Sequence, residues 1–228
     1  MDTRESATLP PLEERFDLVT DTIVVGGHSI DMLKPRSVDD LISEEDFDID
    51  ERLPYWAEVW PSSRVLAEHV SKMPGQGRRF LELGCGVGFA SLMATRVGFK
   101  VLATDYYSEA LEFVQTNARR NSLPLPEVRL VDWRRFPEDL GLFDVVVGSD
   151  ILYERPYTPL IVQAFKRTLV PGGSGFLTDP NRLAANGFPA ECQRQGLNIV
   201  RRMDVPYQNG DVRQIIHLYE LNCQEERS

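Results

Sequence analysis

Three glycines at alternate positions, Gly84, Gly86 and Gly88, follow a short apolar segment at residues 80–83. Glycine has no Cβ atom, so it lets the backbone turn sharply and lets a ligand approach closely. A strand that runs through such a turn into a helix is typical of nucleotide-binding sites in α/β proteins. The sequence therefore predicts a ligand of the nucleotide type at this loop. A glycine turn that only joins two elements is the alternative.

The loop departs in two ways from the sites that bind dinucleotides and phosphates. A dinucleotide fingerprint, Gly-x-Gly-x-x-Gly/Ala, requires a small third residue, and Phe89 stands at that position. The acidic Glu82 lies two residues before the first glycine, where it disfavours a phosphate group. No Gly-Lys-Ser/Thr follows the loop, which excludes a P-loop. The predicted ligand is therefore neither NAD nor a phosphate.

Two further acidic residues stand where predicted strands end. Asp105 follows an apolar segment at residues 100–104, and an acidic side chain there can accept hydrogen bonds from both hydroxyls of an adenosine ribose. Asp132 and Trp133 follow a third strand, residues 128–131, and can hold the adenine through a hydrogen bond and ring stacking. These positions predict adenosine without a pyrophosphate. A surface aspartate that merely ends a strand is the alternative for Asp105.

A fourth strand is expected at residues 143–148, because a nearly continuous apolar run is typical of a parallel strand buried on both faces. Ser149, Asp150 and Tyr153 come directly after it. Ligands of open α/β sheets bind at the carboxyl edge, where the strand order reverses between the first and fourth strands. We therefore expect Asp150 to face the glycine loop across a cleft.

The elements around these residues alternate between strands and helices, which predicts an α/β fold. We expect a Rossmann-like, mostly parallel sheet of seven strands with helices on both faces, closed by an antiparallel hairpin around Asn209 and Gly210. Five helices are expected. The first begins at Pro61 and ends before residues 74–75, the second follows the glycine loop, and the third begins at a cap formed by Ser108. The last two are expected at residues 156–170 and 189–195. The fifth strand is expected at 174–178 and the hairpin strands at 197–205 and 212–221, with a rim loop at 179–182.

The first 52 residues are predicted to form an extension, and residues 53–228 the main domain. The extension would comprise a disordered tail, a small β-hairpin around Gly26 and Gly27, and an acidic loop at residues 39–51. That loop has eight acidic residues and no basic one, and is interpreted as solvated, with docking of a basic partner as the alternative. Trp56 and Trp60 follow, and core packing explains them as well as a ligand does.

The 228 residues suffice for one α/β domain with a full core. The net charge of −10 argues against extensive nucleic-acid binding, because phosphates require a basic surface. Neither an apolar leader nor a run of transmembrane length is present, so we expect a soluble, cytoplasmic protein, and a monomer. Neither a disulfide framework nor a metal site is expected from the scattered cysteines and histidines: Cys85, Cys192, Cys223, His28, His69 and His217.

The motifs together resemble the seven-strand methyltransferases that use S-adenosylmethionine: Glu82 to Gly88, Asp105, Asp132-Trp133 and the closing hairpin. Within that class, the segment PYWAEVWP at residues 54–61 and the segment Asp150-Ile-Leu-Tyr153 are similar to the protein lysine methyltransferases with an Asp-x-x-Tyr motif. The match covers about residues 53–179. The resemblance implies S-adenosylmethionine as cofactor, S-adenosylhomocysteine as product, no metal, and a lysine of one folded protein, whose surface could be basic, as acceptor.

The resemblance also implies a role for each candidate residue. Asp150 and Tyr153 would form the acceptor site, where Asp150 binds and orients the amine, with proton acceptance open, and Tyr153 lines the channel. The glycines would lie under the methionine moiety, flanked by Glu82 and Cys85, with Asp105 on the ribose, Asp132 and Trp133 on the adenine and Trp60 closing over the cofactor. The full set of cofactor contacts would be Trp60, Glu82, Gly84, Cys85, Gly86, Gly88, Asp105, Tyr106, Asp132, Trp133 and Ser149.

Three alternatives share the cofactor half of such a site: a small-molecule methyltransferase, an RNA methyltransferase and a binding module without activity. The acidity of the chain argues against RNA. So does Ser149-Asp-Ile-Leu152, which stands where RNA enzymes would have Asn/Asp-Pro-Pro-Tyr. An inactive module would be expected to lose the loop glycines or Asp150. Asp150 as a second cofactor contact remains the alternative to its acceptor role.

Overall fold

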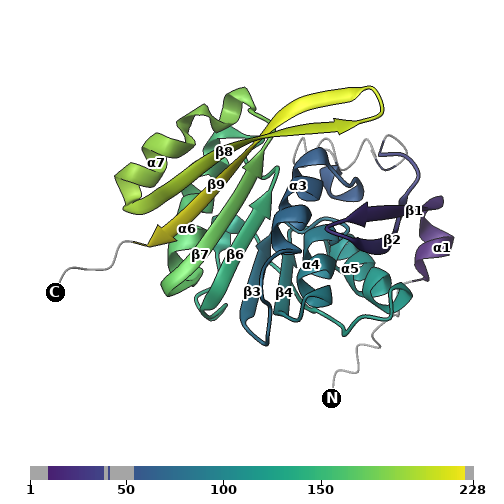
Figure 1. The fold of residues 1–228 in the computed structure, drawn as a ribbon. Helices are drawn as coiled ribbons and strands as arrows, with labels where there is room; N and C mark the ends of the chain where they lie inside the picture. Colours follow the sequence, from purple (N-terminus) through teal and green to yellow (C-terminus); the bar gives the residue numbers. More distant parts are fainter. Residues whose placement is uncertain (1–9, 39–40, 42–53, 224–228) are drawn as a thin grey trace, which may run out of the picture.

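The computed structural model describes residues 10–38, 41 and 54–223 (Figure 1). The predicted tail before residue 10 and nearly all of the predicted acidic loop lie outside these described residues. None of the described helices combines the length and the apolar character needed to cross a bilayer.

A seven-stranded sheet forms the centre of the molecule, with strand order β5-β4-β3-β6-β7-β9-β8 (Figure 1). The strands β3 to β7 are parallel, and β9 pairs antiparallel with both β7 and β8. The predicted sheet and its closing hairpin are thus confirmed, with the order reversing between β3 and β6. The strands span Arg79–Leu83 (β3), Lys100–Asp105 (β4), Glu127–Leu130 (β5), Phe143–Ser149 (β6), Leu169–Asp179 (β7), Leu197–Asn209 (β8) and Val212–Cys223 (β9).

Helices cover both faces of the sheet, because the strand side chains alternate between two apolar cores. In β3, Phe80 belongs to the core under one helical layer, whereas Leu81 and Leu83 belong to the core under the other. The first layer consists of α3 (Pro61–Val70), α4 (Phe89–Arg96) and α5 (Ser108–Arg120), and the second of α6 (Thr158–Thr168) and α7 (Phe188–Gln195). Short 3-10 turns lie at Tyr55–Ala57 (η2), Trp133–Arg135 (η3), Arg155–Tyr157 (η4) and Leu183–Gly187 (η5).

The predicted N-terminal hairpin is present as β1 (Leu18–Val25) and β2 (His28–Pro35), preceded by a short helix, α1 (Leu12–Arg15). Gly26 and Gly27 have φ angles of 58° and 77°, as a tight two-residue turn between twisted strands requires. Ile30 and Met32 are fully buried in the core that also contains Phe113 of α5. The hairpin therefore shares the core of the main sheet.

Two asparagines, Asn117 in α5 and Asn121 at the C-cap of that helix, hold the free edge of β2. The side-chain oxygens of Asn117 and Asn121 accept from the backbone N–H groups of Leu33 and Asp31, at 2.7 and 2.8 Å. Their amide nitrogens donate to the carbonyls of the same two residues, at 3.0 and 2.8 Å. Asn117 Nδ2 also donates to the carbonyl of Val87 in the glycine loop, at 3.1 Å. The hairpin is thereby joined to the loop through one buried side chain.

Some predicted boundaries were wrong. Ser108 is the first residue of α5, not its cap; Tyr107 occupies the cap position and the Ser108 hydroxyl donates to Glu109 instead. Helix α3 ends at Val70, before Met73. Strand β7 begins at Leu169, where a helix to residue 170 was expected, because the Pro171-Gly-Gly173 segment bulges out of the ladder rather than ending a helix. Phe143 pairs with Leu169 and Val145 with Ser174, so the register shifts across that segment.

Candidate active site

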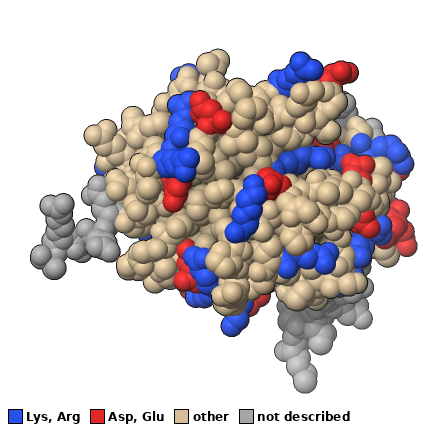
Figure 2. Space-filling model, viewed as in Figure 1, with Lys and Arg blue, Asp and Glu red and all other residues tan. Residues whose placement is uncertain are grey.

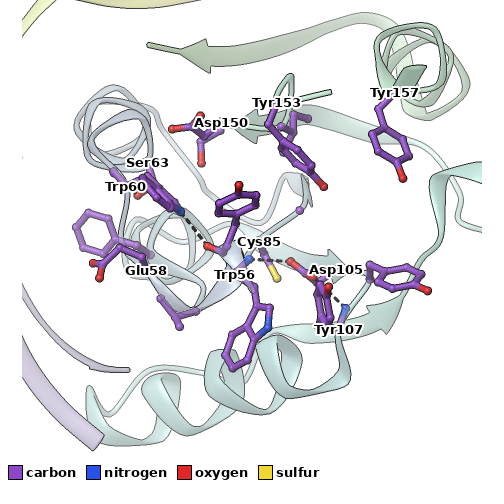
Figure 3. Close-up of a pocket in the computed structure, with 18 of the residues that line it drawn as sticks. Trp56, Glu58, Trp60, Ser63, Cys85, Asp105, Tyr107, Asp150, Tyr153 and Tyr157 are labelled. Atoms are coloured by element: carbon purple, nitrogen blue, oxygen red, sulfur yellow. Dashed lines mark hydrogen bonds between the residues drawn. The ribbon is translucent and has the colours of Figure 1, made fainter. Parts of the chain in front are cut away.

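A cavity of about 300 Å³ lies at the carboxyl ends of β3, β4 and β6 (Figure 3). Figure 3 shows Asp150 and Tyr153 on one side of it and Asp105 and Tyr107 across from them. The predicted position at the carboxyl edge of the sheet is where the cavity is found.

The glycine loop is fixed to the end of β4 by the carboxylate of Asp105. Its Oδ2 accepts from the Gly86 N–H at 2.9 Å, and its Oδ1 accepts from the Tyr107 N–H at 3.0 Å. Burial raises the pKa of Asp105, while these backbone hydrogen bonds oppose that rise. Gly86 has φ 51°, and a Cβ atom there would lie 2.8 Å from the carbonyl oxygen of Trp56. Only glycine fits this position, so the loop and Asp105 are held in one arrangement.

Asp132 caps the 3-10 turn η3, Trp133 begins it, and both residues line the cavity. Asp132 Oδ1 accepts from the Arg134 backbone N–H, and its carboxylate pairs with the Arg134 guanidinium, each at 2.9 Å. The guanidinium lies 5.5 Å from the Tyr106 ring centre. Trp133 packs so closely on Gly84 that a Cβ there would come within 3.3 Å of the indole. These contacts fix both residues beside the glycine loop.

Asp150 has an uncommon backbone conformation for a residue with a side chain, with φ 59°. Its N–H donates to the Thr178 carbonyl at 2.8 Å, which holds the turn against the end of β7. Its side chain is only 5% exposed, and its Oδ1 accepts from Nε of Arg182 at 2.6 Å. A buried carboxylate thus faces the cavity with a charged partner from the next loop.

A second buried carboxylate, Asp179, ends β7 directly before the loop that contains Arg182. Its Oδ1 accepts from the Arg182 N–H at 2.8 Å. Its Oδ2 is buried and has no hydrogen-bond partner among the described residues. Burial raises the pKa of Asp179 to about 6. Asp179 does not itself line the cavity but supports the arginine that does.

Aromatic rings form one wall of the cavity. Tyr55 lies 6.0 Å from Trp60 and 5.7 Å from Tyr153, measured between ring centres. Tyr157 continues the series, 6.1 Å from Tyr153 and 5.9 Å from Trp133. The indole N–H of Trp60 donates to the Tyr55 carbonyl at 2.8 Å (Figure 3). Such a wall can hold an alkyl chain or a cation against the faces of the rings.

The cavity brings together eleven of the thirteen residues predicted from the sequence. Glu82 and Gly88 do not line it. Glu82 is 1% exposed and accepts a hydrogen bond from the Ser91 hydroxyl of α4. A Cβ at Gly88 would lie 2.7 Å from Val114 of α5, so this glycine permits helix packing rather than ligand approach. The residues that line the cavity are Trp60, Gly84, Cys85, Gly86, Asp105, Tyr106, Asp132, Trp133, Ser149, Asp150 and Tyr153.

Several lining residues were not predicted as site residues. Arg182 lies in the predicted rim loop, and Tyr157 lies four residues after Tyr153, but neither position belongs to a motif. Tyr55, Trp56 and Glu58 belong to the tryptophan-rich segment before α3. The density of aromatic residues in that segment is the one signal that could have indicated them.

Comparison with known proteins identifies the fold that carries this site. A sequence profile described as a methyltransferase domain matches residues 80–173. The solved structure of SMU.776 complexed with SAH superposes with a TM-score of 0.64 at 9% identity, over 89% of this chain and 55% of that one. Residues 80–173 thus match a methyltransferase domain, and the chain shares the fold of a structure solved with SAH.

The methyltransferase domain is similar in sequence to several curated proteins. Mouse protein-lysine methyltransferase METTL21E is 32% identical over 49% of this chain and 50% of its own length. Mouse EEF1A lysine methyltransferase 3 is 30% identical, over 58% of each chain. The ubiquinone biosynthesis O-methyltransferase of Nitrosococcus oceani is 31% identical over 46% of this chain and 45% of its own. The chain thus spans about half the length of the curated relatives it matches.

The charge of the cavity fits S-adenosylmethionine better than a dinucleotide. S-adenosylmethionine is a cation with ribose hydroxyls and no phosphate, whereas a dinucleotide carries two phosphates. Among the described residues that line the cavity, five carboxylates accompany one guanidinium, that of Arg182. This excess of negative charge suits the cationic S-adenosylmethionine and repels a dinucleotide. Asp105, at the end of β4, is placed to accept from ribose hydroxyls. The carboxylates that line the cavity are Glu58, Asp105, Asp132, Asp150 and Glu154.

Proposed function

We propose that this chain transfers a methyl group from S-adenosylmethionine to a nitrogen nucleophile, and that the acceptor is a lysine side chain of a specific protein. The observation that supports this most directly is the buried Asp150 carboxylate, which faces the cavity beside Tyr153 and opposite Asp105. A carboxylate and aromatic rings together suit an amine on an alkyl chain.

One half of the cavity would bind the cofactor, and the other half would bind the acceptor amine. Asp105 would bind the ribose hydroxyls, and Asp132 and Trp133 the adenine. S-adenosylmethionine, when bound, supplies an electrophilic methyl group on a positively charged sulfur. Asp150 would orient the acceptor amine, and the rings of Tyr55 and Tyr153 would exclude water. Positioning of this kind is the main contribution that a protein makes to such a displacement.

The Asp150 carboxylate creates a difficulty for an amine acceptor. A lysine amine has a reference pKa near 10.4 and reacts only without its extra proton, whereas a nearby carboxylate favours the charged ammonium. A partly dry aromatic pocket favours the neutral form. Asp150 therefore binds and orients the amine in our proposal, and the proton leaves before transfer.

Two relatives named as lysine methyltransferases support the proposal that the substrate is a protein. A net charge of −10 favours a partner with a basic surface. The face seen in Figure 2 has acidic and basic side chains interspersed, with no broad basic field of the kind that RNA binding requires. A small-molecule acceptor is the second candidate, because one relative is named as a ubiquinone O-methyltransferase.

We further propose a reducing, cytoplasmic location and a monomer, with the methyltransferase domain at residues 53–228. The three free cysteines, of which Cys85 and Cys192 are buried, suit a reducing compartment.

One experiment separates the acceptor classes. The purified protein is incubated with methyl-labelled S-adenosylmethionine and a cell extract, and the labelled species is located by mass. Labelled lysine in one protein is the expected result. Label confined to RNA or to a small molecule would replace the proposed substrate class, and no label beyond that of a heat-treated sample would refute the activity.

A further inference from the structure

We infer that Arg182 is a positioning residue that cancels the charge of Asp150, so that the acceptor site takes an amine in its neutral form. This inference rests on the proposed transfer to an amine. Arg182 lines the cavity and donates from Nε to Asp150 Oδ1 at 2.6 Å. Its guanidinium also lies 6.0 Å from the centre of the Trp60 ring. The arginine is therefore held in the cavity between Asp150 and Trp60.

The loop after β7 is built to hold that arginine. Asn181 has φ 64°, and the Arg182 N–H is bound by Asp179 Oδ1. The guanidinium thus lies near two carboxylates, those of Asp150 and Asp179, whose negative charges it partly compensates. Because Asp150 is nearly fully buried, leaving it without a cation would be costly.

The other charged and titratable groups at this end of the cavity do not replace Arg182. Glu58 pairs with Lys34 at 2.5 Å, which compensates its charge. Glu154 can only add negative charge. The titratable groups that line this end of the cavity are Tyr55, Glu58, Tyr153, Glu154 and Arg182, in addition to Asp150, and Asp179 binds Arg182 without lining the cavity. Arg182 is the one cation among the described residues that line the cavity.

This arrangement changes which form of an amine the site prefers. Without the guanidinium, Asp150 would bind an ammonium strongly and hold its proton. When Asp150 is paired with Arg182, the site stabilises the bound ammonium form less, and the amine releases its proton to solvent. The neutral nitrogen then gives its lone pair to the methyl carbon, the carbon–sulfur bond breaks and the sulfur keeps that electron pair. Arg182 thus promotes transfer by lowering the pKa of the acceptor amine, without touching the reacting atoms.

The test measures binding of n-butylamine, a probe for a lysine side chain, by amide NMR at pH 7 and pH 9. In the unchanged protein we expect the affinity to rise about tenfold per pH unit, because the neutral fraction of the amine also rises about tenfold per pH unit below its pKa. In Arg182→Met we expect binding at pH 7 at least about tenfold tighter than in the unchanged protein, with little dependence on pH. Arg182→Lys keeps the charge and should resemble the unchanged protein.

Arg155→Met is the matched control, because Arg155 is an exposed arginine in η4 that does not line the cavity. This substitution should leave the affinity for n-butylamine unchanged at both pH 7 and pH 9. Arg182→Gln provides a second uncharged variant if Arg182→Met does not fold. Equal affinity of the charge-free variant and the unchanged protein at pH 7, including no detectable binding by either, would overturn the inference.

A second measurement excludes a purely structural role. With the labelled acceptor in hand, the acidic limb of the pH profile of kcat should move upward by about one to two pH units in Arg182→Met. A decrease in kcat of the same size at every pH would contradict the proposed cancellation of the Asp150 charge. If the unchanged protein transfers no methyl group, the proposed function fails, whereas the binding experiment still decides the role of Arg182.

Discussion

Glu82 should make the stability of this protein depend on pH well above the usual range of a carboxyl group. It lies in the middle of β3, is 1% exposed and accepts a hydrogen bond from Ser91. Burial raises its pKa from 4.5 to about 8, although the bond from Ser91 opposes that rise. Replacement by glutamine keeps the shape and the acceptor oxygen but removes the ionisation.

The direction of the effect follows from linkage. The folded state binds the proton of Glu82 more tightly than the unfolded state does, so its contribution is full below pH 4.5 and is lost as the pH rises through 8. The loss would be about 1.4 kcal/mol per pH unit, or roughly 5 kcal/mol in all. Glu82→Gln should therefore match the unchanged protein near pH 5 and exceed its unfolding free energy by several kcal/mol near pH 9.

Urea denaturation from pH 5 to 9, on the unchanged protein and on Glu82→Gln, measures this difference directly. Glu127→Gln is the matched control, because Glu127 is exposed at the start of β5 and should change the curve little. Parallel curves for the unchanged protein and Glu82→Gln across this range would refute the reasoning. They would mean that Glu82 ionises in the folded state as readily as in the unfolded chain.

Three further predictions concern the two halves of the site and the hairpin. Asp105→Ala should weaken binding of S-adenosylmethionine by about 10- to 100-fold, measured by calorimetry, because charged hydrogen bonds to the ribose are lost; unchanged affinity would contradict the adenosine assignment. Asp150→Ala should abolish methyl transfer but keep nearly the same cofactor affinity, and lost affinity would assign Asp150 to the cofactor instead. Asn117→Ala should lower the unfolding free energy by roughly 2–4 kcal/mol in urea, because buried backbone groups lose their partners; a change no larger than that of Asn121→Ala, whose bonds are more exposed, would contradict this.

The sequence predicted the parts of the site that belong to strand ends. Asp105 ends the largely buried strand β4, Asp150 follows the largely buried strand β6, and Asp132 follows the more exposed edge strand β5. Parallel strands bring residues at such positions to one edge of the sheet. Arg182 lies in the loop after β7 and Tyr157 in the 3-10 turn η4, and the positions of these segments depend on packing over long distances, which periodicity does not encode. Their part in the site could therefore be seen only in the folded chain.

Glu82 shows where the motif and the geometry differ. Side chains in a strand alternate between faces, so Glu82 shares the face of Phe80 and contacts Ser91 of α4 instead of lining the cavity. The alternation of β3 contained that information, but the position beside the glycines suggested a ligand contact. A similar difference applies to Gly88, whose missing side chain admits α5.

The two asparagines at the C-terminal end of α5 have a consequence for the solution behaviour of the protein. An open strand edge is a template on which another chain can add a strand, and many proteins block such edges to avoid aggregation. Asn117 and Asn121 present two amide groups, one helical turn apart, that bind alternate residues of β2 as a neighbouring strand would. The helix thus blocks growth of the hairpin into a larger sheet. A shift of β2 by one residue would break all four bonds at once, so the same pair of side chains also guards against misregistered folding.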